Sequence, residues 1–362
     1  MAEYSRKMAE RTMGLDLGDK NSHYCVLDRE GEEIETGRVA TRAGALEEKF
    51  RSMGPTRVVM ETGTHSPWVS RLAEGCGHEV IVANARKVQL ISQNRKKRDK
   101  VDAELLARLG RSEPELLYRV RHRGEEAQRG LVLLKSREAL VKARTELITH
   151  LRGAVKSLGS RLEPCSPECF HRRMVGKLPR GLAGLEGWML EMIGKLTEQI
   201  RQLDRAVERL GEEKYPETEL LRQVKGVGPL TSLAYVLVLE DTERFERARA
   251  VGSYLGLCPA LDESGEQSPQ LRISKEGDQM LRRLLVSCAQ YILGPKGQDS
   301  DLRRWGKKLE GRGGKHAKKR AVVAVARKLA VLLYVLWSRG EVYEPLRGSW
   351  MKSLEAAPAG TV

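Results

Sequence analysis

The order of short apolar runs in the first quarter of the chain constrains the fold more than any other feature. Three runs separated by turn residues, at 13–17, 23–27 and 33–39, predict a meander of antiparallel strands. A polar helical stretch at 43–53 follows, then a β-rich run at 57–60, a helix at 67–75 and a strand at 79–83. We therefore predict a mixed α/β domain over residues 1–120.

Four acidic residues lie at the ends of predicted strands or at the start of the next predicted helix. Asp16 and Glu61 lie at the ends of two apolar strands, where an acid contributes little to folding, and Asp99 and Asp102 are three apart, on one face of the next helix. Such carboxylates repel one another unless cations lie between them, and their oxygens suit Mg²⁺, with Mn²⁺ as a substitute. Two such ions could clamp a phosphodiester. Taken singly, Asp99 and Asp102 could be a solvated helix start, and Asp16 could cap a turn.

The middle of the chain has a different periodicity. Leu133, Leu140 and Leu147 step by seven, as do Leu134, Val141 and Ile148, and a second seam alternates steps of four and three at Met189, Ile193, Leu196, Ile200, Leu203, Val207 and Leu210. We predict an antiparallel coiled-coil connector over residues 121–214, with a helix-free turn at about 165–187. It would serve as a spacer or as the arm of a homodimer or homotetramer. Two amphipathic helices of a globular bundle fit the spacing equally well.

The last part of the chain predicts a helical domain over residues 215–350 with a tail at 351–362. Lys225, Gly226 and Gly228 lie between two helical runs, as in helix-hairpin-helix motifs that bind phosphate through backbone amides. A Gly-x-Gly turn is also an ordinary helix connector. Cys165, Cys169 and His171 could suggest zinc, but they lack a fourth ligand.

The charge of the chain points to a polyanionic partner. Its 362 residues carry a formal net charge of +15, and only 5% of them are aromatic. We expect nucleic-acid contacts at Lys225, Lys275 and two basic clusters: Arg95, Lys96, Lys97, Arg98 and Lys100, and Arg312, Lys315, Lys318, Lys319 and Arg320.

No apolar run follows Met1, the apolar stretch from Ala321 to Trp337 contains Arg327 and Lys328, and six cysteines lie scattered. A soluble, cytoplasmic protein with no membrane partner is expected.

Three antiparallel strands followed by alternating helix and strand is the ribonuclease-H-like order, and short motifs extend the likeness. They are Gly14-Leu15-Asp16-Leu17-Gly18, Val58-Val59-Met60-Glu61-Thr62-Gly63, Arg98-Asp99-Lys100-Val101-Asp102-Ala103, Gly226-Val227-Gly228, Tyr254-Leu255-Gly256-Leu257-Cys258-Pro259, Ser264-Gly265 and Ile273-Ser274-Lys275-Glu276-Gly277-Asp278. Together they resemble the transposases of the insertion-sequence one-ten type over nearly the whole chain.

The resemblance implies a RuvC-like domain whose DEDD tetrad is Asp16, Glu61, Asp99 and Asp102, and a C-terminal domain with a serine nucleophile. The position that matches the family's Ser-Gly motif is Ser264. The family often has a second serine before that glycine, where this chain has Glu263, so Ser268 and Ser274 are the other candidates. The resemblance also implies double-stranded donor and target DNA and a noncoding guide RNA, the bridge RNA.

Three other functions would each account for part of the sequence. A structure-selective endonuclease, like the resolvases of Holliday junctions, would use the same carboxylates with water and form no covalent intermediate. An actin-like ATPase also opens with an acid and a glycine on a strand, but the chain has no convincing second Asp-x-Gly phosphate loop. An RNA scaffold would use the basic clusters alone and would not depend on metal.

Overall fold

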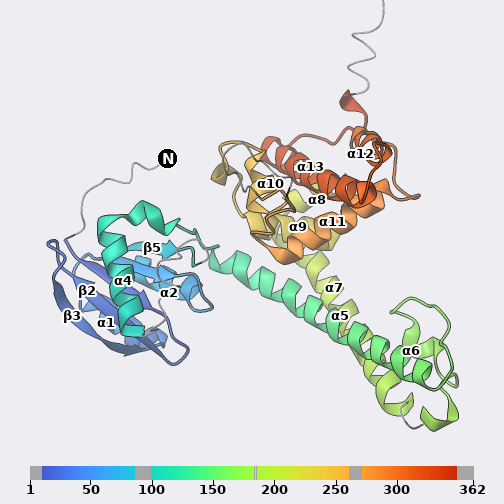
Figure 1. The fold of residues 1–362 in the computed structure, drawn as a ribbon, viewed down its shortest axis with the longest axis horizontal. Helices are drawn as coiled ribbons and strands as arrows, with labels where there is room; N and C mark the ends of the chain where they lie inside the picture. The colour runs from blue at the N-terminus through green and yellow to red at the C-terminus, as the bar shows by residue number, and fades with distance from the viewer. Residues whose placement is uncertain (1–9, 86–98, 183, 185, 261–270, 349–362) are drawn as a thin grey trace, which may run out of the picture. The chain divides into compact units, whose positions relative to one another are not determined.

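The computed structural model describes residues 10–85, 99–182, 184, 186–260 and 271–348. The chain divides into two compact units, residues 1–125 and 126–362. The first contains a five-stranded sheet, and the second is helical (Figure 1).

The sheet of the N-terminal unit has the strand order β3-β2-β1-β4-β5. Its strands are β1 (Thr12–Asp16), β2 (Asn21–Leu27), β3 (Glu33–Ala40), β4 (Arg57–Glu61) and β5 (Glu79–Ala83). The first three pair antiparallel, whereas β4 pairs parallel to β1 and β5 pairs parallel to β4. This mixed sheet is consistent with the predicted RuvC-like domain. The first strand begins one residue earlier than expected and ends at Asp16, so Leu17 lies outside it.

Helices cover both faces of the sheet (Figure 1). On one face, Leu15 and Met60 pack with Leu46 and Phe50 of α1 (Ala43–Arg51) and with Val69 of α2 (Ser66–Gly75). The opposite face belongs to α4 (Asp99–Ser112), and η1 (Pro114–Leu117) follows it. Because side chains alternate along a strand, β2, β4 and β5 contribute buried side chains to both layers.

Two long helices open the C-terminal unit and run antiparallel. They are α5 (Glu125–Ser157) and α7 (Glu191–Lys214). Lys214 Nζ lies 3.3 Å from Glu126 Oε1, and Arg144 Nη1 donates to Thr197 Oγ1 over 3.4 Å. The first contact joins the start of α5 to the end of α7, and the second joins the later part of α5 to the start of α7. The two helices therefore form an antiparallel hairpin.

The seam of the hairpin is only partly as predicted. Ile193, Ile200 and Val207 are buried at steps of seven, as the spacing indicated. On α5, Leu134 and Ile148 are buried, but Leu133, Leu140 and Leu147 are half-buried, and the side chain of Arg144 is 6% exposed within the seam. Its Nη2 atom donates to Glu168 Oε1 over 3.0 Å.

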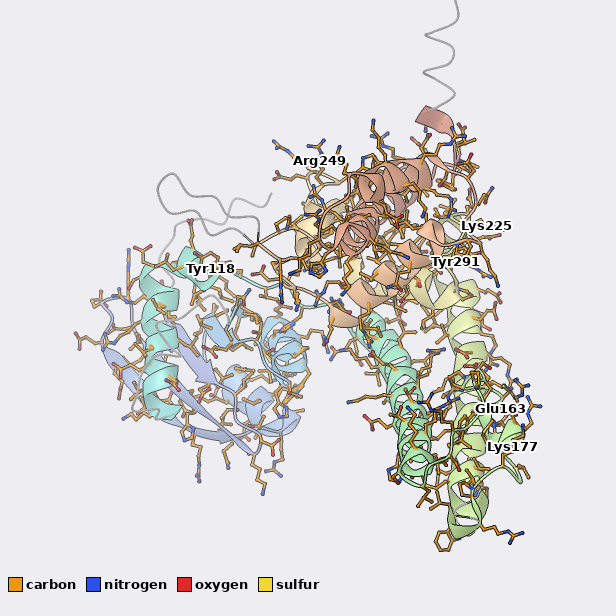
Figure 2. The ribbon with its side chains drawn as sticks, turned by 45° about the vertical axis from the view of Figure 1, so that its right-hand side comes forward. Tyr118, Glu163, Lys177, Lys225, Arg249 and Tyr291 are labelled. Carbon is orange, nitrogen blue, oxygen red and sulfur yellow. The ribbon has the colours of Figure 1, made fainter. Side chains whose placement is uncertain are left out.

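The far end of the hairpin corrects one expectation. The prolines and glycines do not exclude helix there, because three short helical segments form: α6 (Phe170–Arg173), η2 (Arg180–Leu182) and η3 (Glu186–Leu190). Phe170 and Met174 pack against Leu151 and Ile193, and Glu163 pairs with Lys177 at 2.8 Å (Figure 2). Cys165, Cys169 and His171 belong to no metal-binding group within the described ranges.

The other helices of this unit share one apolar core. They are α8 (Glu217–Arg222), α9 (Pro229–Leu239), η4 (Thr242–Arg244), α10 (Ala250–Tyr254), α11 (Gln279–Leu293), α12 (Asp301–Gly311) and α13 (Ala317–Arg339). By length and composition α13 could cross a membrane, but Val325, Leu329 and Leu333 are fully buried in this core. The hydroxyl of Tyr235 donates to Ala330 O over 2.6 Å. The apolar composition of α13 is therefore that of a core helix.

Candidate active site

Two of the predicted acids end neighbouring parallel strands. Asp16 is the last residue of β1 and Glu61 the last of β4, and the two strands pair with Leu15 opposite Met60. Side chains alternate along each strand, so Asp16 shares a face with Gly14, and Glu61 shares a face with Val59. Both acids are half-buried. The register thus brings the two carboxylate-bearing positions to the same edge and the same face of the sheet.

Helix α4 lies across this face at very short range. A Cβ atom on Gly14 would lie 2.0 Å from Ala103 O and 2.5 Å from Ala107 N, so only glycine permits the contact. At the other end of α4, Gly110 O accepts a hydrogen bond of 3.0 Å from Arg57, the first residue of β4. The helix therefore runs antiparallel to β1 and β4, and its N-terminus lies at the strand ends that carry the acids.

Asp102 lies in the first turn of α4, next to Ala103. Its Oδ1 atom is buried and has no hydrogen-bond partner in the described part of the chain. A buried carboxylate oxygen is costly unless a donor or a cation compensates it, and an orphaned one fits a position that is completed by a metal ion. Asp99 begins the helix, and its side chain lies outside the described residues.

These acids do not form a closed metal site. Within the ranges that the structure describes, no three histidine, cysteine, aspartate or glutamate side chains group closely enough to hold an ion. The backbone brings Asp16, Glu61 and Asp102 to one edge of the sheet, and the chemistry of their oxygens fits a divalent cation.

A histidine that sequence reasoning missed lies beside the loop after β4. His122 Nε2 lies 2.9 Å from Ser66 Oγ, which also accepts a hydrogen bond from Gly63 N and donates one to Gly63 O. Burial, and then the charges of Arg71 and Arg123, lower the pKa of His122. The neutral imidazole is therefore favoured. No local pattern could identify it, because its partner lies 56 residues away in the sequence.

A second histidine, His65, lies on the same loop. The indole of Trp68 donates to His65 Nδ1 over 3.1 Å, and His65 Nε2 lies 3.7 Å from the exposed carboxylate of Asp19. Because Nδ1 accepts, the proton belongs on Nε2, toward Asp19. No role could be assigned to His65 and Asp19 from the sequence, and the contact places them together near the end of β1.

The predicted nucleophile falls on a segment outside the described residues, which include neither Ser264 nor Ser268. Both ends of that segment are described. Pro259 and Ile273 form an antiparallel bridge, and Ala260 N donates to Arg272 O over 2.9 Å. Ser274, the third candidate, is half-buried, and its Oγ accepts a hydrogen bond from Glu276 N over 3.4 Å. That contact is typical of a serine that stabilises a turn.

Two interlocked glycine turns support this bridge. Gly256 has a φ of +63°, and a Cβ atom on it would lie 2.2 Å from Glu276 O; Gly277 has a φ of +76°, and a Cβ atom there would lie 2.0 Å from Tyr254 O. Arg282 Nη1 donates to both Leu255 O (3.0 Å) and Glu276 O (2.7 Å). The two segments that bracket the serine positions are thus fastened to each other and to α11.

Most of the predicted basic contacts are exposed. Lys100, Lys225, Lys275, Arg312, Lys315, Lys318, Lys319 and Arg320 all face solvent, while Arg95, Lys96, Lys97 and Arg98 lie outside the described residues. Gly226 has a φ of +103°, and Gly228 precedes α9, so the predicted turn does join two helices. Tyr291, 45% exposed, packs against Gly226 on the side that carries Lys225 (Figure 2).

Comparison with known proteins gives matches in both units. Residues 13–159 match the DEDD transposase family of IS110 type, described as "Transposase", and residues 218–301 match the "Transposase IS116/IS110/IS902 family". The transposase for insertion sequence element IS1111A of Coxiella burnetii is 29% identical over 92% of this chain and 91% of its own length. The transposase for IS1328 of Yersinia enterocolitica is 26% identical over 91% and 98%.

A relative with a different name is the pilin gene-inverting protein of Moraxella bovis, 26% identical over 77% of this chain and 79% of its own length. The two family matches follow each other in the order of the two units and together span more than half of the chain. The five-stranded mixed sheet of the first unit is consistent with these matches. The chain belongs to the IS110/IS116 family of DEDD transposases, enzymes that act on DNA.

Proposed function

We propose that the chain cuts and rejoins the DNA of a mobile insertion sequence, with Asp16, Glu61, Asp99 and Asp102 as ligands of Mg²⁺ and with Ser264 as nucleophile. One observation carries the proposal. The start of α4 lies over the ends of β1 and β4, and Asp102 Oδ1 is buried there with no hydrogen-bond partner among the residues that the structure describes. Two ions per site, replaceable by Mn²⁺, fit this number of carboxylates.

The bound cations would supply charge stabilisation for the phosphate and the departing oxygen. The hydroxyl of Ser264 attacks phosphorus, so that an Oγ–P bond forms while a P–O bond of the DNA backbone breaks. The serine proton passes to a carboxylate of the tetrad, and the released sugar hydroxyl takes up a proton. One phosphate ester replaces another, so rejoining needs no further source of energy.

The wider recombination machinery is part of the same proposal. A noncoding bridge RNA would pair with donor and target DNA, and the exposed cations would hold nucleic-acid backbones without reading bases. The net charge of +15 supports this role. The α5–α7 hairpin would be the coiled-coil arm of a dimer or tetramer, since recombination joins two duplexes. A relative named for gene inversion supports a reaction that rejoins DNA as well as cutting it.

The experiment combines purified protein, Mg²⁺, the DNA that flanks the element and RNA transcribed from that flank. A denaturant-resistant protein–DNA adduct is expected with the wild type and with two control variants, Ser287→Ala on α11 and Asp204→Asn on α7. It should disappear in Ser264→Ala and in Asp16→Asn. Loss in Ser268→Ala or Ser274→Ala instead of Ser264→Ala would reassign the nucleophile.

Metal-dependent cleavage without any adduct would support the alternative function, a structure-selective endonuclease that uses water. In that case Asp16→Asn would still abolish cleavage, whereas Ser264→Ala would not. The two single variants therefore separate the two chemistries in the same assay.

A further inference from the structure

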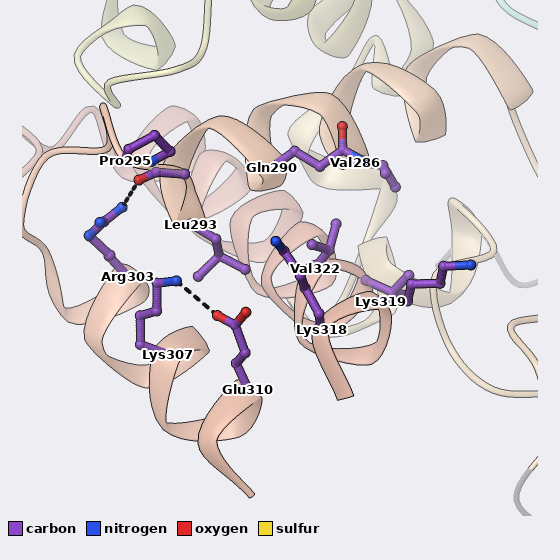
Figure 3. Close-up of a pocket in the computed structure, with 12 residues that line it drawn as sticks. Val286, Gln290, Leu293, Pro295, Arg303, Lys307, Glu310, Lys318, Lys319 and Val322 are labelled. Atoms are coloured by element: carbon purple, nitrogen blue, oxygen red, sulfur yellow. Dashed lines mark hydrogen bonds and ion pairs between the residues drawn. The ribbon is translucent and has the colours of Figure 1, made fainter. Parts of the chain in front are cut away.

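A cavity of about 810 Å³ opens between α11, α12 and α13 (Figure 3). Its apolar lining comes from Val286 and Leu293 of α11, Pro295 after that helix, and Val322 and Val323 of α13. Of the described residues that line the cavity, none is aromatic. The volume is within the range of small-molecule and cofactor sites, and a single nucleotide would fit inside it.

The mouth of the cavity is positively charged. Arg303, Lys307, Lys318 and Lys319 contribute to its lining, against one carboxylate, that of Glu310. Lys307 Nζ already pairs with Glu310 Oε2 at 2.8 Å, and Arg303 Nη1 donates to Gly294 O at 2.6 Å (Figure 3). The exposed ammonium groups of Lys318 and Lys319 thus add charge beyond what Glu310 balances.

The same charge continues past the cavity. The connection from α12 to α13 carries the exposed cations Arg312 and Lys315, and Arg320 follows on the first turn of α13. A row of cations that leads to an apolar pocket fits a nucleic-acid strand, whose phosphates would bind the cations while one base enters the pocket. An acidic protein segment would need only the few cations at the rim of the cavity, and not the row that continues beyond it.

We propose that this cavity receives one unpaired base of the DNA substrate, while Lys318 and Lys319 bind the phosphates on either side of it. The faces of a base are apolar, and enzymes hold extruded bases between apolar or aromatic side chains. Strand exchange requires such unpaired nucleotides. The proposal rests on DNA as the substrate and not on the serine or the metal.

The test uses the full chain and a DNA duplex that carries 2-aminopurine as a one-nucleotide bulge. This base is quenched by stacking, so transfer into an aliphatic cavity without aromatic rings should raise its emission several-fold. An abasic nucleotide at the same position should weaken binding by about 10-fold, because the apolar surface of the base is then no longer buried in the cavity. Both effects should persist in Asp16→Asn and Ser264→Ala, which keeps this result separate from the proposed chemistry.

Two sets of variants probe the two parts of the site. Val286→Met with Val323→Met narrows the cavity with longer apolar side chains and should reduce both the emission rise and the abasic difference. Lys318→Ala with Lys319→Ala should weaken binding of normal and abasic DNA alike and lower the salt dependence. The matched control is Lys142→Ala with Lys195→Ala, which removes two exposed lysines from the hairpin.

Emission that stays quenched in the wild type, or that rises equally in the methionine variant, would overturn the proposal. So would equal affinity for normal and abasic DNA. If an acidic, leucine-rich peptide binds instead, and the methionine variant loses that binding, the cavity is a protein-docking site.

Discussion

Both units hold their functional segments through glycines, but in different ways. In the N-terminal unit, Gly14 lets α4 approach the backbone of β1, and the acids lie on regular strands and a helix. In the C-terminal unit, Gly256 and Gly277 supply both space and a positive φ, and they fasten the two ends of the segment that contains Ser264. The proposed metal ligands thus lie on regular elements, whereas the proposed nucleophile lies on a segment whose two described ends are fastened to each other.

The largest effect is expected at Gly14. In Gly14→Ala the new methyl group would meet backbone atoms of α4, so the free energy of unfolding of this unit should fall by about 3 kcal/mol or more. Chemical denaturation followed by circular dichroism measures it. Gly44→Ala is the control, because its methyl group would have no neighbour within 4 Å. In helix α1 it should raise stability by about 0.5–1 kcal/mol. Similar stabilities for the two variants would contradict the role given to Gly14.

Asp102 separates function from stability within the same unit. Asp102→Asn should reduce metal-dependent DNA cleavage by about 100-fold, the order expected when metal coordination is impaired. Without metal the variant should unfold at the same or a higher temperature, because a neutral amide replaces a buried charge. Glu104→Gln serves as control, since Glu104 pairs with Arg108 at 2.8 Å on the same helix. If Asp102→Asn without metal were clearly less stable than the metal-free wild type, Asp102 would have a structural role.

Gly277 tests the other half of the comparison. Gly277→Ala combines backbone strain with a clash against Tyr254 O and should lower the free energy of unfolding by about 2 kcal/mol or more. Gly340→Ala has strain alone, at a φ of +63° with no neighbour within 4 Å, and should lower it by about 1 kcal/mol. Adduct formation should disappear only in Gly277→Ala. If Gly277→Ala and Gly340→Ala lost equal stability and equal activity, the close contact between Gly277 and Tyr254 would have no importance of its own.

The smallest effect is the pH dependence due to His122. Its pKa in the folded state is lowered from 6.5, so as pH falls below 6.5 the unfolded chain takes up the proton first. Wild-type stability should therefore decrease below that pH and be unaffected by this group above it. In His122→Gln the decrease should be smaller, as measured by denaturant midpoints across the pH range. His150→Gln, at an exposed histidine of α5, should behave like the wild type. If His122→Gln lost more stability at low pH than the wild type, the folded protein would not favour the neutral imidazole of His122.

The sequence by itself determined what depends on local periodicity. Short apolar runs bounded by turn residues predicted every strand of the sheet. The positions of Asp16 and Glu61 at the ends of two of these runs predicted that the two acids could meet where adjacent strands end. The spacing of Ile193, Ile200 and Val207 predicted a buried helix face. These patterns repeat over a few residues, so they can be recognised without knowing what packs against them.

Only the tertiary structure decided which distant surfaces meet. The contact of Gly14 with Ala103 sets the direction of α4, the burial of Arg144 depends on Thr197 and Glu168, and His122 depends on Ser66. The basic cavity joins three helices whose separate sequences show only apolar and charged faces. Partners separated by tens of residues leave no short pattern in a single sequence, because the geometry that joins them arises when the core packs.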